Sequence, residues 1–313
     1  MANRTNLDTV IGTGPLGIAV MHELLSRGKH VRLVNRSGKA DVPGNVEVQG
    51  GDIGDHAFAR EACRSSHSVY LCAKPPYIEM AERFQPIMDG AIEGAAAAGA
   101  KLIYADSLYV YGSVSGPLKE DLPYAATGKK GQTRASLATK LMAAHKAGKV
   151  RATLGRASDF YGPGVVESSV GERVFGFALA GKAASVLGDP DTPHTYTYIE
   201  DFARALVNLG ERDEALGEIW HVPSAETLTT RAFVDLVFEE LGMPARIQAA
   251  PRWLVSLVGV FNPLMRELKE VLYQFEAPFV VDHSKYQAAF GAESTPHREA
   301  IRRTLDWCRQ KAG

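Results

Sequence analysis

The glycine pattern near the start of the chain constrains the fold more than any other feature. Residues 10–17 read Val-Ile-Gly-Thr-Gly-Pro-Leu-Gly, so Gly12, Gly14 and Gly17 have the spacing G-x-G-x-x-G. A short apolar strand is expected just before the pattern, and a helical pattern follows it. In this setting the first glycine permits a tight turn, the second lets a pyrophosphate approach the backbone, and the third lets the helix pack against the strand. The pattern predicts a dinucleotide-binding turn.

The phosphates of such a ligand bind where the helix begins. The free amides and the positive end of the helix dipole both favour an anion there. A proline suits the first helical turn, because that position has no need of an amide donor. We therefore expect phosphate contacts along the whole turn, at Gly12, Thr13, Gly14, Pro15, Leu16 and Gly17.

Expected strands and helices alternate over the first half of the chain. The order predicts an α/β protein with a doubly wound parallel sheet, the Rossmann fold. After Gly164 the alternation stops, and helical patterns dominate. We expect a dinucleotide-binding domain at 1–165, to which 198–222 return, and a smaller, mainly helical substrate lobe at 166–197 and 223–313. The expected strands are 8–11, 30–35, 46–48, 68–71, 101–105, 151–155 and 218–222, and the expected helices are 79–99, 135–146, 168–181, 200–210, 228–241 and 296–311.

Composition excludes several classes of protein. The net charge is −1 and the charges are scattered, which argues against a nucleic-acid partner. The first residues contain no apolar signal region, so we expect a cytoplasmic protein. The cysteines are Cys63, Cys72 and Cys308; their spacing fits no metal site, and we expect reduced thiols and no metal. The apolar run Trp253–Phe261 is too short to span a membrane; a buried helix is favoured over a membrane-surface anchor.

The end of the second expected strand favours NADP over NAD. An NAD site usually presents a carboxylate to the ribose 2′-hydroxyl at this point, but the chain reads Asn35-Arg36-Ser37. A guanidinium and a hydroxyl suit a 2′-phosphate; on the alternative interpretation, Arg36 is a solvated loop residue. Asp52 lies in a Gly-Asp-x-x-Asp turn, and it either meets the adenine edge or only forms the turn.

Four segments, in order, resemble the extended short-chain dehydrogenases/reductases, the NAD-dependent epimerase/dehydratase family. They are Gly51-Asp52-Ile53, Ser107-Leu-Tyr-Val-Tyr-Gly112, Phe160-Tyr-Gly-Pro-Gly164 and Tyr198-Ile-Glu-Asp-Phe-Ala-Arg-Ala205. The resemblance implies an enzyme with a nicotinamide cofactor and a small-molecule substrate. It also implies a homodimer, paired through the helix from Glu79 and the helix that carries Lys140. The further cofactor contacts that it implies are Asp52, Ile53, Cys72, Ala73, Lys74, Ser107, Lys140 and Phe160.

In that family a Ser or Thr, a Tyr and a Lys carry the chemistry, the last two spaced Tyr-x-x-x-Lys. Ser107 corresponds to the Ser and Lys140 to the Lys, but Ser136 stands where the Tyr is expected. A phenol beside a cation can be tuned toward neutral pH, whereas an aliphatic hydroxyl cannot. The chain therefore resembles the atypical short-chain dehydrogenases/reductases, which generally lack this tyrosine.

Three side chains are candidates to replace the missing phenol. Asp106 either faces the cleft or caps backbone amides at the end of its strand. Tyr109 lies two residues beyond Ser107 and offers a phenol. His194 is either a proton shuttle in the substrate lobe or a histidine of a surface turn.

Three functions remain open at this point. The first, which we favour, is an NADP-dependent enzyme that acts on a carbonyl, alcohol or sugar-like substrate with a relocated acid. The second is a non-catalytic NADP-binding regulator or scaffold. The third is a non-redox isomerase or lyase on the same fold.

Overall fold

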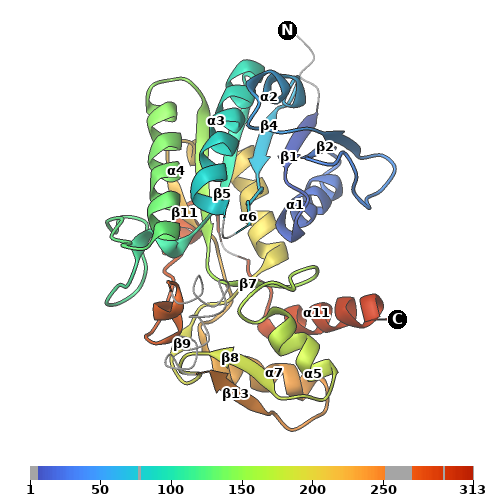
Figure 1. Ribbon diagram of the computed structural model, residues 1–313, viewed down its shortest axis with the longest axis vertical. Helices are drawn as coiled ribbons and strands as arrows, with labels where there is room; N and C mark the ends of the chain where they lie inside the picture. Colours follow the sequence, from blue (N-terminus) through green and yellow to red (C-terminus); the bar gives the residue numbers. More distant parts are fainter. Residues whose placement is uncertain (1–5, 77–78, 251–269, 292, 313) are drawn as a thin grey trace. The chain divides into compact units, whose positions relative to one another are not determined.

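The computed structural model describes residues 6–76, 79–250, 270–291 and 293–312. The chain divides into two compact units (Figure 1). The first unit comprises 1–110, 129–156 and 202–222, and the second comprises 111–128, 157–201 and 223–313. Residues 111–128, 157–165 and 198–201, expected in the dinucleotide-binding domain, fall in the second unit of this division.

The first unit contains a seven-stranded sheet in the order β11-β6-β5-β4-β1-β2-β3. The pairs β1–β2, β1–β4, β2–β3, β4–β5 and β6–β11 are parallel. From β1 the chain adds β2 and β3 on one side and β4, β5, β6 and β11 on the other. The topological switch point therefore lies between β1 and β4, and ligands bind at the carboxyl ends of the strands there in such sheets. The strands are β1 (Leu7–Ile11), β2 (His30–Asn35), β3 (Glu47–Gly50), β4 (Ser68–Leu71), β5 (Lys101–Ser107), β6 (Arg151–Ala157) and β11 (Ile219–His221).

Helices cover this sheet. Helices α2, α3 and α4 pack side by side (Figure 1), while the ends of α1 and α6 are joined by an ion pair of 2.6 Å between Arg27 and Glu211. The strands β1 and β4 are almost wholly buried, as expected for a sheet with helices on both faces. The helices are α1 (Pro15–Ser26), α2 (His56–Ala62), α3 (Met80–Ala98), α4 (Lys129–Lys146) and α6 (Ile199–Glu211), with 3₁₀ turns η2 (Leu108–Tyr111) and η4 (Asp213–Ala215).

Helix α4 begins six residues earlier than the sequence pattern predicts, at Lys129 instead of Ala135. Its first turns carry lysine, glutamine and threonine side chains, which hide the apolar periodicity on which the prediction relied. The buried side chains Lys130, Arg134, Leu137 and Leu141 nevertheless repeat at i, i+4, i+7 and i+11, so they form one face of the helix. The early start therefore brings two cationic residues onto the buried side of α4.

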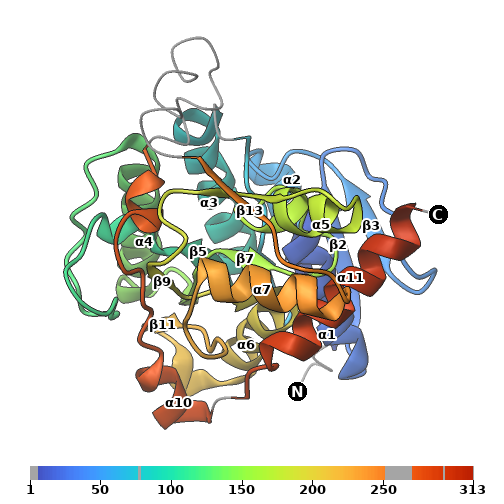
Figure 2. The same ribbon diagram turned by 90° about the horizontal axis from the view of Figure 1, so that it is seen from below.

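The second unit is built around an aromatic core. The rings of Tyr161 and Phe233 lie 4.9 Å apart, and those of Tyr196 and Phe233 lie 4.7 Å apart. Figure 2 shows α7 and α11 running side by side over this core. The elements are the strand pairs β7 (Phe160–Tyr161) with β10 (Thr197–Tyr198), β8 (Ala184–Leu187) with β13 (Ile247–Ala250) and β9 (Pro193–His194) with β12 (Leu228–Thr229), and the helices η3 (Gly171–Gly176), α5 (Phe177–Leu179), α7 (Thr230–Glu240), η5 (Leu272–Phe275), α10 (Ser284–Phe290) and α11 (His297–Ala312).

Local signals in this unit were partly readable from the sequence. Thr229 caps α7 as expected, because its hydroxyl accepts a hydrogen bond of 3.1 Å from the amide of Ala232. The helix expected at 168–181 is a π-helical turn followed by one short α-helical turn, and strand β13 was not predicted. The apolar run Trp253–Phe261 lies outside the described residues. No described helix has the length and apolar character to cross a bilayer.

All three cysteines are free thiols, and burial raises the pKa of the Cys63 thiol to about 12. At that pKa the thiol is inert at neutral pH. Within the described ranges, no cluster of three or more His, Cys, Asp or Glu side chains is arranged to hold a metal.

A buried carboxylate in β1 makes the stability of the first unit depend on pH. Asp8 accepts a hydrogen bond of 3.0 Å from the amide of Ser68. Burial raises its pKa to about 6, against the opposing charge of Lys29. Because the folded pKa lies above the unfolded value, the stabilising contribution of the protonated form is complete below about pH 4 and is lost as the pH rises through 6.

We therefore expect Asp8→Asn to stabilise the protein at pH 7.5 by up to about 3 kcal/mol, since the amide oxygen still accepts from Ser68 without carrying charge. The difference from wild type shrinks toward zero as the pH falls below about 4. Urea denaturation at several pH values measures it. A gain that does not depend on pH would contradict the assignment.

Candidate functional site

The glycine turn between β1 and α1 has three distinct local geometries. Gly12 has φ +107°, and a Cβ there would lie 2.7 Å from the backbone of Ala73. A Cβ at Gly17 would lie 1.9 Å from the carbonyl oxygen of Gly12, so only glycine lets the helix approach the turn. At Gly14 a Cβ would meet no atom within 4 Å. Neighbouring backbone thus fills the space beside Gly12 and Gly17, whereas the space beside Gly14 is free for a ligand group.

This open side lies at the amino end of a twelve-residue helix. Gly14 caps α1 with extended backbone angles, and Pro15 takes the first helical position. The exposed amides of the first turn and the helix dipole are suited to an anion. The residues therefore fit the pyrophosphate of a dinucleotide; Thr13, within the turn, is half-buried and Leu16, in the first turn of α1, is buried. Their roles as contacts remain predictions.

The loop after β2 is organised by Asn35. Its side-chain nitrogen donates to Thr13 Oγ1 at 3.0 Å and to the carbonyl of Lys39 at 2.9 Å. Its oxygen accepts from the amides of Ser37 and Gly38. With its hydrogen-bonding groups used in this way, Asn35 shapes the loop. Arg36 is exposed, and no hydrogen bond or ion pair to it is found among the described residues.

The end of β4 borders the glycine turn. The amide of Cys72 donates to the carbonyl of Ile11 at 2.9 Å, and the backbone of Ala73 limits the space at Gly12. Lys74 follows as an exposed residue. In the loop after β3, Asp52 accepts from the amide of Gly54 at 2.9 Å and is exposed, while Ile53 is buried. Asp52 thus forms the turn, whatever further contact it makes.

Ser107 occupies the last position of β5, two strands from β1 in the same sheet. Its hydroxyl oxygen is buried and has no hydrogen-bond partner among the residues that the structure describes. An unsatisfied buried hydroxyl costs about 1–3 kcal/mol, so a ligand oxygen that accepted a hydrogen bond from it would recover that cost. Since β1, β4 and β5 are parallel neighbours, this hydroxyl and the glycine turn lie at the same edge of the sheet.

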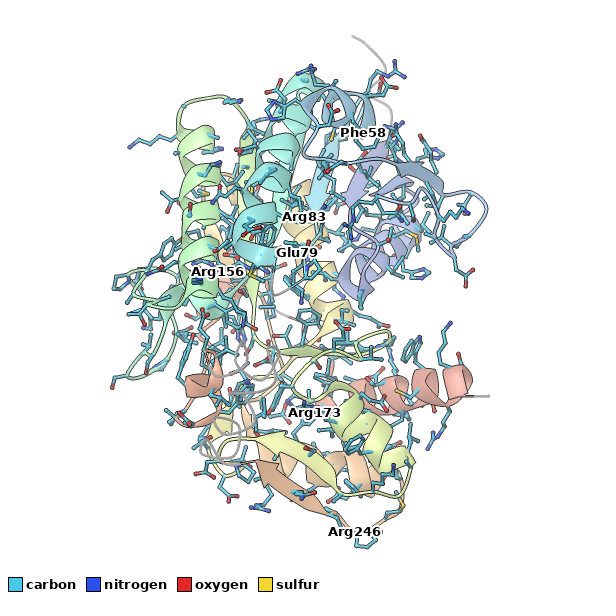
Figure 3. All side chains as sticks on the ribbon, viewed as in Figure 1. Phe58, Glu79, Arg83, Arg156, Arg173 and Arg246 are labelled. Carbon is cyan, nitrogen blue, oxygen red and sulfur yellow. The ribbon has the colours of Figure 1, made fainter. Side chains whose placement is uncertain are left out.

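Asp106, one residue earlier, is held between two arginines. Its Oδ2 accepts from Arg156 Nε at 2.9 Å and its Oδ1 from Arg134 Nη1 at 3.3 Å. Arg156, on β6, is fully buried (labelled in Figure 3). Of the two interpretations of Asp106, neither the cleft-facing acid nor the cap of backbone amides describes this setting. The carboxylate anchors two buried guanidinium groups.

Arg134 comes from the buried face of α4. Its Nη1 donates to Tyr104 Oη at 2.7 Å, and its guanidinium lies 4.7 Å above the ring of Phe84. Burial alone would lower the pKa of Arg134, but Tyr104 and Asp106 outweigh it and the pKa is raised. Arg134 is therefore a firmly held cation, and its Nε is buried without a hydrogen-bond partner in the described part of the chain.

Lys140 and Ser136 lie on another side of α4. Lys140 Nζ pairs with Asp89 of α3 at 2.6 Å, and both side chains are more than a third exposed. Ser136 Oγ accepts from Gln85, also of α3, at 2.8 Å. Six residues of helix turn Lys140 through about 240° from Arg134. The buried face of α4 carries Lys130 and Arg134, and the assignment of Lys140 to the site stays a prediction.

The sequence contains a signal that identifies these two cations. Counting back from the apolar Leu141 and Leu137 by helical steps reaches Arg134 and then Lys130. The helix expected from the sequence begins only at Ala135, because the residues before it are mostly polar and do not continue the apolar pattern.

His194 lies in the second unit and is almost fully buried. Its Nδ1 faces the carbonyl of Gln274 at 3.1 Å and its Nε2 faces Asp159 Oδ2 at 3.0 Å. Both nitrogens therefore face acceptors, and the ring stacks on Phe275 and Phe279. Neither a surface turn nor an accessible proton shuttle fits this environment, and His194 is a packed structural residue.

Tyr109, in η2 of the first unit, and Phe160, on β7 of the second, are both half-buried.

Comparison with known proteins identifies the family whose sequence pattern this chain matches. Residues 10–222 match the model of the NAD dependent epimerase/dehydratase family. A curated relative from Arabidopsis thaliana, 3beta-hydroxysteroid-dehydrogenase/decarboxylase isoform 1, is 26% identical; the match covers 94% of this chain and 69% of the relative. Isoform 2 from the same plant is 25% identical over 84% of this chain, and the match covers 52% of that protein. The chain thus spans only part of each relative.

Solved structures share the fold at lower identity. The UDP-glucose 4-epimerase from Thermotoga maritima, with UDP-glucose, has a TM-score of 0.82 at 17% identity, covering 98% of this chain and 100% of that one. A dTDP-glucose 4,6-dehydratase from Streptomyces venezuelae, with NAD bound, has a TM-score of 0.79 at 17% identity, covering 98% of each chain.

The different settings of Arg134 and Lys140 lead to a paired prediction about stability. Arg134→Met removes a buried guanidinium with three neighbours, and we expect a loss of about 2–3 kcal/mol. Lys140→Met breaks an exposed ion pair, and we expect a loss below about 1 kcal/mol. Chemical denaturation of the two variants in parallel measures the difference. Equal losses would show that Arg134 is not held as described.

Proposed function

Since the chain belongs to the NAD-dependent epimerase/dehydratase family, we propose that it is an NADP-dependent oxidoreductase that interconverts an alcohol and a carbonyl group on a small substrate. One observation carries the proposal. The glycine turn and the unpartnered hydroxyl of Ser107 lie at the same edge of one parallel sheet, within one compact unit. That is the edge at which open α/β sheets bind ligands.

Different residues of the chain bind the cofactor and orient the substrate. The glycine turn and the start of α1 hold the pyrophosphate, and the loop after β2 holds the adenosine ribose. When bound, the nicotinamide gives or takes a hydride. Ser107 Oγ donates a hydrogen bond to the substrate oxygen, which both orients the reacting carbon and stabilises negative charge that develops on that oxygen.

The names of the relatives direct the choice of substrates. The plant relatives are 3beta-hydroxysteroid-dehydrogenase/decarboxylases, and the solved structures include enzymes of nucleotide sugars. We propose a secondary alcohol or ketone on a ring as the reacting group. We also propose a cytoplasmic homodimer, paired through α3 and α4.

The cofactor preference yields a direct test on Arg36. Arg36 is exposed and has no partner among the described residues, so its guanidinium is available to pair with a 2′-phosphate. We expect Arg36→Ala to weaken binding of NADPH by about tenfold, in line with the loss of one charge-assisted contact of about 1.4 kcal/mol. NADH is the matched control, because it lacks the 2′-phosphate, and its affinity should be unchanged. Fluorescence titration of both dinucleotides measures this; equal losses for both would remove Arg36 from the site.

The redox activity itself is tested by stopped-flow measurement of hydride transfer from NADPH across cyclic ketones, sterol ketones and nucleotide-linked keto sugars. We expect NADPH oxidation with at least one class, and Ser107→Ala should lower kcat by about 10²-fold. Tight NADPH binding with no turnover would instead favour a non-catalytic NADP-binding regulator. Product formation without cofactor consumption would favour an isomerase or lyase.

A further inference from the structure

The carboxyl end of β5 extends beyond the strand that pairs with it on one side. The last residue of β5 that pairs with β4 is Tyr104, opposite Leu71, whereas β5 continues to Ser107. Residues 105–107 therefore have no partner in β4 among the pairs of the described sheet, and the ladder of backbone hydrogen bonds does not hold them on that side. This stretch includes Ser107, whose hydroxyl we expect to meet a ligand.

Side-chain contacts replace the ladder where this pairing ends. Asp106 accepts a hydrogen bond from Arg156 of β6 at 2.9 Å through Oδ2, and one from Arg134 of α4 at 3.3 Å through Oδ1. All three of these side chains are buried. Arg134 is held in turn by Tyr104 Oη at 2.7 Å and by the ring of Phe84 of α3 at 4.7 Å. The ion cluster of Asp106, Arg134 and Arg156 thus ties the end of β5 to β6, α3 and α4.

The hydroxyl of Ser107 depends on this anchoring. Its oxygen is buried and has no hydrogen-bond partner in the described residues, so no hydrogen bond within that part of the chain fixes its place. Its position follows from the backbone at residue 107, which is joined directly to Asp106, with about 3.8 Å between the two Cα atoms. Movement of Asp106 is therefore passed on to Ser107. A misplacement of about 1 Å at a reacting group costs about 10²-fold in rate.

The carboxylate of Asp106 does not itself reach a substrate. Both of its oxygens accept hydrogen bonds from guanidinium groups, and its side chain is fully buried. A carboxylate that is buried and engaged at both oxygens is in no position to exchange a proton with a ligand. Asp106 is therefore not a replacement for the missing phenol, and its effect on the reaction passes through the residue next to it.

We propose that Asp106 is a positioning residue of the site: through the ion cluster it fixes the end of β5, and so holds Ser107 Oγ where a substrate oxygen accepts its hydrogen bond. The inference rests on the proposed oxidoreductase function, in which Ser107 makes that bond. Arg134 of α4 then supports the site through Asp106 and needs no contact with substrate. A cluster that served stability alone would, when weakened, lower the free energy of unfolding and leave the chemistry at residue 107 unchanged.

The first test needs neither cofactor nor substrate. Ser107→Cys places a thiol at the end of β5, and its rate of alkylation by iodoacetamide is measured by mass spectrometry of the cysteine peptides. Cys63, fully buried in the same unit, is the internal reference, because its thiol reacts only when the interior of the unit opens. We expect the ratio of the two rates to rise by about tenfold when Asp106→Asn is added, since the loosened end of β5 exposes residue 107 more often.

Two further variants make this test selective. Tyr104→Phe removes only the hydroxyl that accepts from Arg134, so it keeps Asp106 paired and serves where Asp106→Asn does not fold; we expect the ratio to rise by about threefold. Asp213→Asn is the matched control. It makes the same chemical change in the partner of Lys101, 2.7 Å away at the other end of β5, and it should leave the ratio unchanged.

The second test is a double-mutant cycle with NADPH and a substrate that turns over. We expect Asp106→Asn to lower kcat by about 10–10²-fold with a smaller change in KM, because a misplaced hydroxyl fails mainly in the transition state. In the Ser107→Ala background the same substitution should change kcat by less than about twofold, because no hydroxyl is left to position. Arg134→Lys, which keeps a cation beside Asp106, should lose less kcat than Arg134→Gln.

The inference fails on any of three results. One is an alkylation ratio that stays the same in whichever of Asp106→Asn and Tyr104→Phe folds, or that rises equally in Asp213→Asn. Another is an equal loss of kcat from Asp106→Asn with and without the Ser107 hydroxyl, which would assign the ion cluster a structural role only. The third is full kcat in Asp106→Asn.

Failure of the proposed function gives a different outcome. The expected alkylation ratios, together with no hydride transfer to any substrate, would support the anchoring of residue 107 by the ion cluster and contradict the oxidoreductase activity. The two failures are therefore distinguishable.

Discussion

The contact on which the first unit depends is the approach of α1 to the turn that precedes it. At Gly17 there is no room for a side chain, because a Cβ would lie 1.9 Å from the carbonyl oxygen of Gly12. The absence of that one carbon lets the helix begin directly against β1. Because β1, β4 and β5 are parallel, the amino end of α1 then lies at the edge of the sheet where the carboxyl ends of these strands meet. Every ligand contact that we propose for this unit is arranged along that edge.

A second constraint sets the position of α4. Buried arginines are costly unless they are paired, and here Asp106 pairs with two of them at once. Arg134 cannot leave the sheet without exposing this arrangement, and its contact with Phe84 adds α3 to the same cluster. The ion cluster thus fixes the rotation of α4 about its axis, and that rotation decides which side chains face the sheet and which face α3.

The sequence was informative where the cause of structure is local. The glycine spacing, the strands β2 and β4 and the Thr229 cap depend on a few adjacent residues, and these predictions agree with the structure. The start of α4 and the setting of Arg134 depend on Tyr104, Asp106 and Phe84, which are 28 or more residues away in the chain. No short-range periodicity contains that information. His194 illustrates the same limit, since the partners that occupy both its nitrogens are Asp159 and Gln274.

In the loop after β2, the residue that sets the backbone conformation differs from the residue whose exposed side chain can contact a ligand. The side chain of Asn35 makes most of the hydrogen bonds that fold residues 35–39, Ser37 adds a hydrogen bond to Lys39, and Arg36 takes no part in those found among the described residues. The side chain at position 36 can therefore be exchanged without disturbing the backbone that displays it. If the loop holds the ribose as we propose, a substitution at position 36 would change the charge offered to the ribose while the strand, the turn and the helix beside it stay as they are, and nucleotide preference would be easy to change in evolution.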